Sequence, residues 1–317
     1  MNNFFVICLV KDLKELLTAI QIGQADKMAN VAKAIKLYNL TKEWMMEGDS
    51  RGRTPLHLAS SYGYHNAVKI IVKENIDSMD NDFLKKQFIN VTDFKGRTPI
   101  FHASAKGHFN IVQLLADRNA DLDIPTNEHH QEPGSTPLMV CAGRNDAECF
   151  GILLAKRANL LATRNDGADA IYIASRYGNV NILKKVYDLN KIHQVVNRPS
   201  FRGRTPIITA SLHGHMEVCR FLFTHGANLD IQDDDKCSAL MYAAYEGQYF
   251  IVKFLVENGA NINLRNEEGN TALMCAEANK RGKSAYYLSS RRTLVKPANS
   301  KEKRKVRIAS VRRKSVR

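Results

Sequence analysis

Cysteine is scarce in this sequence, which has 6 cysteines among 317 residues. No two of them form a CxxC pair, and no spacing suits a zinc site. Scattered cysteines are typical of a reduced intracellular protein, in which they are small buried residues rather than reactive thiols. They are Cys8, Cys141, Cys149, Cys219, Cys237 and Cys275.

Long hydrophobic runs are missing as well. Phe4 to Val10 is apolar, but the stretch is short, has no basic residue before it and leads directly into Lys11 and Asp12. A signal peptide needs a basic flank, and a membrane-spanning helix needs about 20 apolar residues. We therefore expect neither a signal peptide nor a membrane span.

Two signatures of common enzyme classes are also absent, since no HExxH or G-x-G-x-x-G occurs. Gly282-Lys283-Ser284 is similar to the end of a phosphate-binding loop, but Glu277 occupies the place of its first glycine. His129 and His130 are adjacent in a polar loop, where their side chains diverge, so they favour an exposed loop over a metal site. We expect no catalytic residue, cofactor, metal or small-molecule substrate.

Acidic residues are depleted in only one part of the chain. Lys280 to Arg317 holds 15 Lys and Arg and a single acid, Glu302, which gives a net charge of +14. The residues before Lys280 hold 31 charges of each sign. The excess of positive charge therefore belongs to the C-terminal end.

A recurring unit is present instead, and residues 203–230 show it most clearly. Thr205 can cap a helix with its hydroxyl, and Pro206 suits the first helical position. Gly214 can adopt the left-handed conformation that ends a helix, and Met216 to Thr224 has apolar residues at helical spacing. The pattern predicts two short antiparallel helices. Such hairpins are marginal alone and need neighbours to cover their apolar faces.

The unit recurs with spacings of 44, 38, 33, 36, 33 and 33 residues. The first copy, Thr54-Pro55-Leu56-His57-Leu58-Ala59, resembles the T-P-L-H-x-A signature of ankyrin repeats, whose period is about 33 residues. The resemblance extends from about Asp49 to Arg292. The helical starts of the copies are Thr54, Thr98, Thr136, Asp169, Thr205, Ser238 and Thr271.

The resemblance implies an all-α ankyrin-repeat solenoid of about seven helix-turn-helix units. We predict a helical N-terminal cap, a degenerate repeat, over residues 1–48, the repeat array over 49–290 and a disordered basic tail over 291–317. The 11-residue insertion between Asn75 and Asn90 predicts an extra helical turn. Asn145 and Lys280 stand where glycine usually ends the first helix, and Asp169 and Ser238 replace the capping threonine.

Members of this family typically bind protein partners along a concave surface, and their repeat histidines usually hydrogen-bond between neighbouring repeats or turns. The positions before each inter-helix turn should form one row of large aromatic and basic side chains, the types that most often anchor interfaces. Scattered surface side chains without a role are an equally weighted alternative. The predicted partner-binding row is Tyr62, Lys106, Arg144, Arg176, Tyr177, His213 and Tyr245.

Arginine also recurs in the GRTP motif, at Arg53, Arg97 and Arg204, which suggests an acidic partner. Asp230 and Asp233 to Asp235 suggest that another part of the surface is acidic, so a bipolar partner would suit it.

The tail resembles a bipartite nuclear-import signal, with two basic clusters separated by a spacer. Contacts with tubulin, an acidic membrane or nucleic acid are alternatives for the same charges. Ser310 and Ser315 follow basic residues and resemble phosphorylation sites. The basic residues are Arg291, Arg292, Lys303, Arg304, Lys305 and Arg307.

Together these features predict a non-enzymatic adaptor or scaffold, cytoplasmic or nuclear, that binds a protein on its repeats and makes a second contact through the tail. The alternative is a nucleic-acid-associated or filament-associated protein whose tail is the main binding element. Steep weakening by salt would favour tail binding to a polyanion.

Overall fold

The computed structural model describes residues 48–75 and 81–291. The expected N-terminal cap, except for Gly48, and the tail beyond Arg291 lie outside these residues. The described chain falls into two compact units. The described residues of the first unit come from Met1–Ile173 and Lys184–Leu189. Those of the second unit come from Ala174–Leu183 and Asn190–Arg317.

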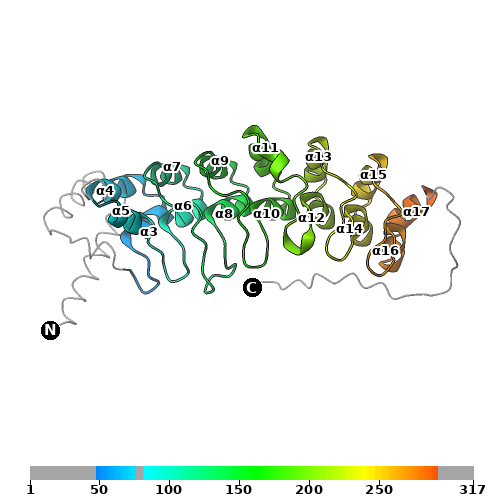
Figure 1. The fold of residues 1–317 in the computed structure, drawn as a ribbon, viewed down its shortest axis with the longest axis horizontal. Coiled ribbons are helices and arrows are strands. Elements are labelled where there is room, and N and C mark those ends of the chain that lie inside the picture. The colour runs from blue at the N-terminus through cyan, green and yellow to red at the C-terminus, as the bar shows by residue number, and fades with distance from the viewer. Residues whose placement is uncertain (1–47, 76–80, 292–317) are drawn as a thin grey trace. The chain divides into compact units, whose positions relative to one another are not determined.

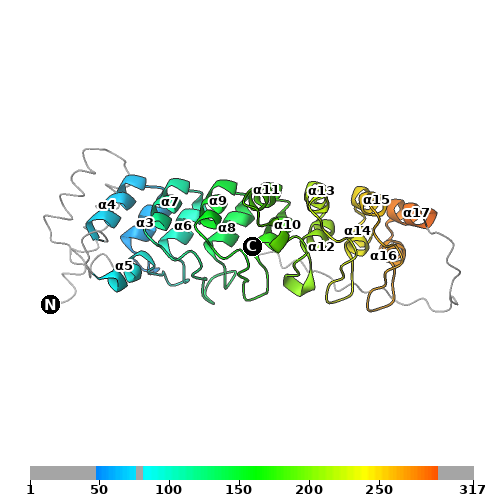
Figure 2. The same ribbon diagram turned by 45° about the horizontal axis from the view of Figure 1, so that its top comes forward.

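The first unit consists of helical hairpins. In Figures 1 and 2 the first helices of its hairpins, α3, α6 and α8, lie side by side, and the second helices form another row. The helices are α3 (Pro55–Tyr62), α4 (His65–Asn75), α6 (Pro99–Lys106), α7 (Phe109–Asp117), α8 (Pro137–Arg144) and α9 (Ala147–Ala155).

The second unit repeats this arrangement, with α12, α14 and α16 as its first helices. Its helices are α12 (Pro206–His213), α13 (Met216–Thr224), α14 (Ala239–Glu246), α15 (Tyr249–Glu257), α16 (Ala272–Ala278) and α17 (Gly282–Ser290). The remaining hairpin, α10 (Ala170–Tyr177) and α11 (Val180–Asp188), contributes residues to both units. Short 3-10 turns lie at Ile192–Gln194 and Phe201–Gly203.

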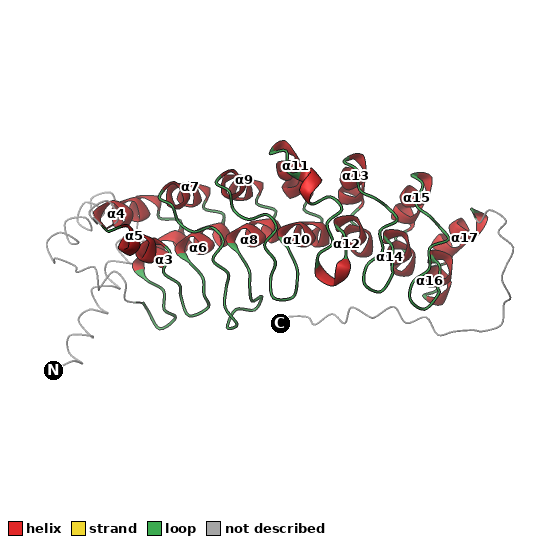
Figure 3. Ribbon diagram, viewed as in Figure 1, coloured by secondary structure: helices red, strands yellow, loops and turns green. Residues whose placement is uncertain are grey.

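Loops join all of these helices, and the described residues contain no strand, only isolated bridges at Thr163 and Gln232 (Figure 3). The all-helical repeat fold with seven hairpins is therefore confirmed. None of the described helices is long and apolar enough to cross a membrane.

Side-chain caps begin several first helices as the sequence predicts. The Asp169 carboxylate accepts a hydrogen bond from the Tyr172 N–H at 2.7 Å, and the Ser238 hydroxyl accepts one from Met241 at 3.4 Å. The prediction that the Thr205 hydroxyl caps a helix is wrong. Its Oγ1 is buried and has no hydrogen-bond partner in the described part of the chain. The backbone of Thr205 still has cap geometry, and Pro206 follows it at the first helical position, so helix α12 starts there without the side-chain bond.

A left-handed residue ends the first helix of a typical hairpin. Gly214 has φ 82°, and a Cβ added there would come within 2.7 Å of the Gln248 amide in the next repeat. Asn145 adopts the same region with φ 58°, and Lys280 with φ 55°. The turn is therefore kept in the repeats that lack the glycine.

The predicted extra helical turn is α5 (Asp82–Ile89). Asn81 caps it by accepting a hydrogen bond from the Phe83 N–H at 2.8 Å. Phe88 and Ile89 at its end are buried, so the insertion is anchored in the first unit.

Apolar residues at helical spacing fill the space between the two helix rows of each unit. In the first unit they include Val68, Ile71 and Val112, and in the second Leu222 and Leu255, all almost fully buried. The cysteines of the described chain are free and buried, as expected, while Cys8 lies outside the described residues.

Candidate functional site

In the first unit, the predicted row occupies equivalent places. Tyr62, Lys106 and Arg144 are the last residues of α3, α6 and α8, and all three side chains are exposed. The Arg144 side chain extends toward the preceding repeat, since its Nη2 lies 3.9 Å from the position of a Cβ at Gly107. These three side chains therefore occur once per repeat along neighbouring helix ends.

In the second unit, the structure brings the predicted Arg176, Tyr177 and His213 together with His215. The Arg176 guanidinium lies 5.8 Å from the centroid of the Tyr177 ring. His213 and His215 stack with ring centroids 6.4 Å apart and an interplanar angle of 4°. His215 also donates a hydrogen bond from Nε2 to the Arg176 carbonyl at 2.8 Å. The sequence indicated His215 only through its repeat position.

The protonation of His213 depends on this cluster. Burial lowers the pKa of His213, and the positive charge of Arg176 lowers it further, while the hydrogen bond to the Thr209 carbonyl opposes both effects. Because the lower pKa favours the neutral imidazole, His213 presents a polar uncharged surface beside the exposed Tyr177.

Tyr245 of the row takes part in a contact between repeats through its backbone. Its side chain is half-buried, and its carbonyl accepts hydrogen bonds from Asn279 at 2.7 Å and from Arg281 at 3.1 Å. His108 makes the same kind of contact between repeats, because its Nε2 donates to the Ser61 carbonyl at 3.2 Å. The expected links between neighbouring repeats are thus confirmed for His108 and His215, whereas His213 bonds to the Thr209 carbonyl of its own helix.

The arginines of the GRTP motif do not form a binding surface for an acidic partner, so this prediction is wrong. Arg53 pairs with Asp49 at 2.6 Å, and Arg97 pairs with Asp93 at 2.7 Å. These carboxylates lie four residues before each arginine, within the same hairpin loop, so the charges are neutralised locally. Both arginines stabilise the loop conformation.

Arg204 is also unavailable to a partner, because it is 2% exposed. Its Nη2 donates to the Tyr242 hydroxyl at 2.9 Å, and its Nε lies 3.3 Å from the Asp233 carboxylate. Asp233 is buried as well and accepts a hydrogen bond from Tyr242 at 2.6 Å. Asp233 is therefore not part of the predicted acidic surface. The sequence did not show this, because the pairing depends on the tertiary structure.

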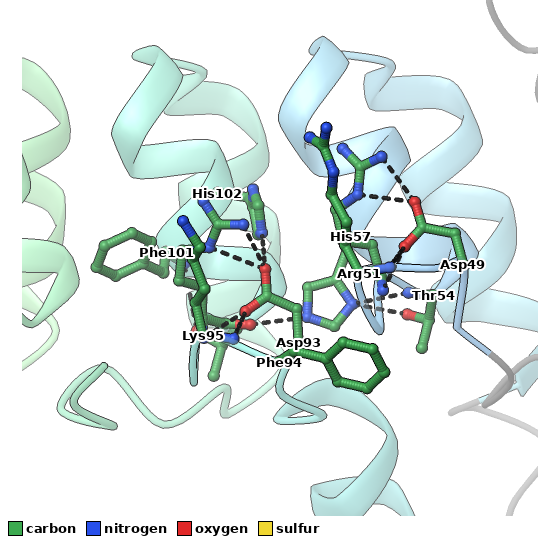
Figure 4. A network of polar contacts seen from close by, with 12 residues as sticks. Asp49, Arg51, Thr54, His57, Asp93, Phe94, Lys95, Phe101 and His102 are labelled. Carbon is green, nitrogen blue, oxygen red and sulfur yellow. Dashed lines mark hydrogen bonds and ion pairs between the residues drawn. The ribbon is translucent and has the colours of Figure 1, made fainter. Parts of the chain in front are cut away.

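A matching network joins the first two repeats, as Figure 4 shows. His57 accepts the Thr54 N–H at Nδ1, at 3.1 Å, and its Nε2 donates to the Arg97 carbonyl at 2.9 Å. His102 lies 3.0 Å from the Asp93 carboxylate. Burial lowers the pKa of His57 to about 4. The hydrogen bonds from His102 and Arg97 hold the pKa of Asp93 well below its usual range, although burial opposes them.

The two adjacent histidines of the inserted loop lie in different surroundings. His129 is exposed, and His130 is turned inward, with its ring edge against Phe101 at a centroid distance of 5.7 Å. No group of histidine, cysteine and acidic residues suited to a metal ion occurs in the described ranges.

Of the predicted tail residues, only Arg291 is described. It is exposed, directly follows α17, and its guanidinium lies 5.4 Å from the centroid of the Tyr287 ring. The others lie outside the described residues, and they are Arg292, Lys303, Arg304, Lys305, Arg307, Ser310 and Ser315.

The chain is similar in sequence to part of two longer proteins. It is 24% identical over 196 residues to human "Transient receptor potential cation channel subfamily A member 1", and 20% identical over 202 residues to its Drosophila melanogaster counterpart. The matches cover 62% and 63% of this chain but only 16% of each channel.

A solved structure shows the same fold. The ankyrin repeat domain of Bcl-3, described as a unique member of the IkappaB protein family, is 25% identical with a TM-score of 0.61. The match covers 74% of this chain and 99% of the Bcl-3 domain.

The family models match more than half of the chain. The model "Ankyrin repeats (3 copies)" matches residues 16–126 and 186–266, and "Ankyrin repeat" matches residues 133–165. Together with the helical hairpins, these matches show that the chain belongs to the ankyrin-repeat family.

Proposed function

We propose that the protein is a non-enzymatic adaptor that binds a protein partner through the row defined by Tyr62, Lys106, Arg144, Arg176, Tyr177, His213 and Tyr245. Ankyrin repeats generally mediate protein–protein interaction. A repeat array suits this task because the same position in successive units presents variable side chains on a fixed scaffold.

One observation carries the proposal. Tyr62 and Tyr177 are each 53% exposed although they end short helices whose other apolar side chains are buried. Exposed cations stand at the equivalent helix ends, at Lys106 and Arg144. Aromatic and arginine side chains are the most frequent interface anchors because they bury a large area and also form hydrogen bonds.

The relatives support protein binding without naming a partner. Bcl-3 is described as a member of the IkappaB protein family, and the channels are far longer than this chain. We therefore carry neither channel activity nor a particular partner over to it.

The basic tail supplies a second contact in this proposal, to an import carrier or to a polyanion, and the protein acts in the cytoplasm, the nucleus or both. The tail-centred alternative, binding of nucleic acid or filaments, draws on the excess of 15 basic residues over one acid in residues 280–317. The salt dependence of binding distinguishes the two hypotheses, because steep weakening by added salt would favour tail binding to a polyanion.

The test replaces Arg144 and Tyr177 by alanine together and compares the proteins captured by proximity labelling with those of the unchanged full-length chain. We expect the row partners to be lost while the thermal unfolding transition is kept, since exposed substitutions usually cost under about 0.5 kcal/mol. Lys253→Ala with Tyr286→Ala is the matched control, because both side chains are exposed on second helices.

The control pair should leave the captured proteins unchanged. Equal capture by the unchanged chain and the Arg144→Ala, Tyr177→Ala variant would contradict the proposal. It would do so most clearly if removal of residues 292–317 abolished capture.

A further inference from the structure

The loop tips of the first two repeats present one aromatic ring in an unusual setting. Phe94 is 64% exposed at the tip of the second-repeat loop. Its ring rests on Gly52 of the first-repeat loop, since a Cβ added to Gly52 would come 2.6 Å from Cδ1 of Phe94. In Figure 4 the ring points toward the first repeat. One side of the ring is supported and the rest is open to a partner.

Two uncompensated cations adjoin this ring. Arg51 and Lys95 are both exposed, and neither forms an ion pair with any described residue. The other two cations of the loops, Arg53 and Arg97, are neutralised by their aspartates. The two loops therefore offer an aromatic face with a net charge of about +2 concentrated on Arg51 and Lys95.

The position of the ring is fixed by the backbone. The Phe94 N–H donates to the Arg51 carbonyl at 3.1 Å, and the Phe94 carbonyl accepts from the Asn127 amide at 3.0 Å. The Asp93 carboxylate accepts the Lys95 N–H at 2.9 Å, and Asp49 accepts the Arg51 N–H at 2.9 Å. A surface held in this way loses little conformational entropy on binding.

We propose that Arg51, Phe94 and Lys95, which we call the tip platform, bind an acidic peptide segment of a partner protein. An apolar side chain of the segment packs on the Phe94 ring, and flanking carboxylates pair with Arg51 and Lys95. The tip platform lies at the start of the first helices, whereas the row lies at their ends, so it is a second binding surface in the first unit.

Charge complementarity favours a peptide over single-stranded nucleic acid. A bound nucleic-acid strand needs a continuous basic groove with successive stacking platforms. The next loops of this unit instead expose the acidic Glu128, and their Arg164 is buried and paired with Glu132 and Asp166, so the basic surface does not continue there. Two cations beside one aromatic ring suit a short acidic segment with a single apolar anchor.

The second unit supplies a natural substitution for the test. Asp234 occupies the place equivalent to Phe94, because its N–H donates to the Arg202 carbonyl at 3.3 Å and its carboxylate lies over Gly203. Phe94→Asp therefore introduces a side chain that this loop conformation already accepts. The new carboxylate removes the apolar anchor and repels an acidic segment.

The experiment selects peptides from a random display library on the full-length protein and measures synthetic copies of them by fluorescence anisotropy. We expect selected peptides to combine acidic residues with an aromatic or large aliphatic residue. Phe94→Asp should weaken their binding at least about tenfold. Phe250→Asp is the matched control, because Phe250 is 74% exposed on α15, and it should bind them normally.

A library that yields no peptide dependent on Phe94 overturns the proposal, as do selected peptides without acidic residues. A fluorescein-labelled oligothymidine that binds and is lost with Phe94→Asp, while peptides are unaffected, assigns the tip platform to nucleic acid instead. If the Arg144→Ala, Tyr177→Ala variant no longer binds the peptides but the Phe94→Asp variant still does, the row is the binding surface and the tip platform proposal is wrong. The reverse pattern supports the tip platform alone.

Discussion

At the scale of single residues, the repeats differ in the residue that adopts the left-handed conformation after the first helix. Most hairpins use glycine there, whereas Lys280 takes φ 55° with an ordinary side chain. The left-handed region costs a residue with a Cβ roughly 1–2 kcal/mol, and asparagine tolerates it better than lysine. Lys280 therefore reduces the stability of the last hairpin.

Lys280→Gly should raise the free energy of unfolding by about 0.5–1 kcal/mol, because the relief of strain exceeds the entropy that glycine loses on folding. The urea unfolding midpoint measures the change. Asn145→Gly is the control and should gain less. An unchanged or lower midpoint for Lys280→Gly would show that the turn is not strained by its side chain.

At the scale of elements, a buried polar network connects the start of α3 with the next loop. His57 is fully buried and bonds to both Thr54 and the Arg97 carbonyl. Neutral His57 satisfies both contacts, since Nδ1 accepts and Nε2 donates. Protonation would place a charge in a region without water contact and would remove the acceptor.

This network predicts destabilisation by mild acid. The pKa of His57 is about 4 in the folded chain, below its ordinary 6.5, so the folded chain binds fewer protons. Stability is complete above about pH 6.5 and falls as the pH approaches about 4, by on the order of 3 kcal/mol. Urea unfolding at several pH values measures the loss.

His57→Gln should be less stable at pH 7 but should change less between pH 6.5 and 4. His129→Gln, in the exposed part of the inserted loop, should keep the pH dependence of the unchanged chain. Equal pH dependence in all three proteins would exclude His57 as the source of acid sensitivity.

At the scale of the whole molecule, positive charge is segregated by sequence. Residues 280–317 carry a net charge of +14, and the remainder is balanced. A segment of this kind attracts polyanions over distances up to about a Debye length, roughly 8 Å at physiological salt. This charge leads us to expect that the tail binds independently of the repeats.

Residues 291–317 fused to an inert reporter should concentrate it in the nucleus, and replacing Lys303, Arg304 and Lys305 by alanine should return it to the cytoplasm. Fluorescence microscopy measures the distribution. Aspartate at Ser310 and Ser315, which mimics phosphate charge, should weaken binding of the tail to a polyanion such as heparin. A cytoplasmic reporter in both forms excludes autonomous import, and salt-insensitive heparin binding excludes the polyanion contact.

The sequence by itself determined the repeat architecture. Thr-Pro starts, glycine stops and a period near 33 residues each act locally, so they predict hairpins without knowledge of neighbours. The inserted helix α5 followed from the length of one interval, and the positions of the row followed from the period. The row's binding role stays a prediction.

Only the tertiary structure decided which charged and aromatic side chains are available. Arg204 is buried against Asp233 and Tyr242 from the next repeat, and Phe94 rests on a glycine of the previous one. Such pairings join residues about one repeat apart. A local pattern reports which residue stands at a position, whereas its exposure and free charge depend on which atoms the neighbouring repeat places beside it.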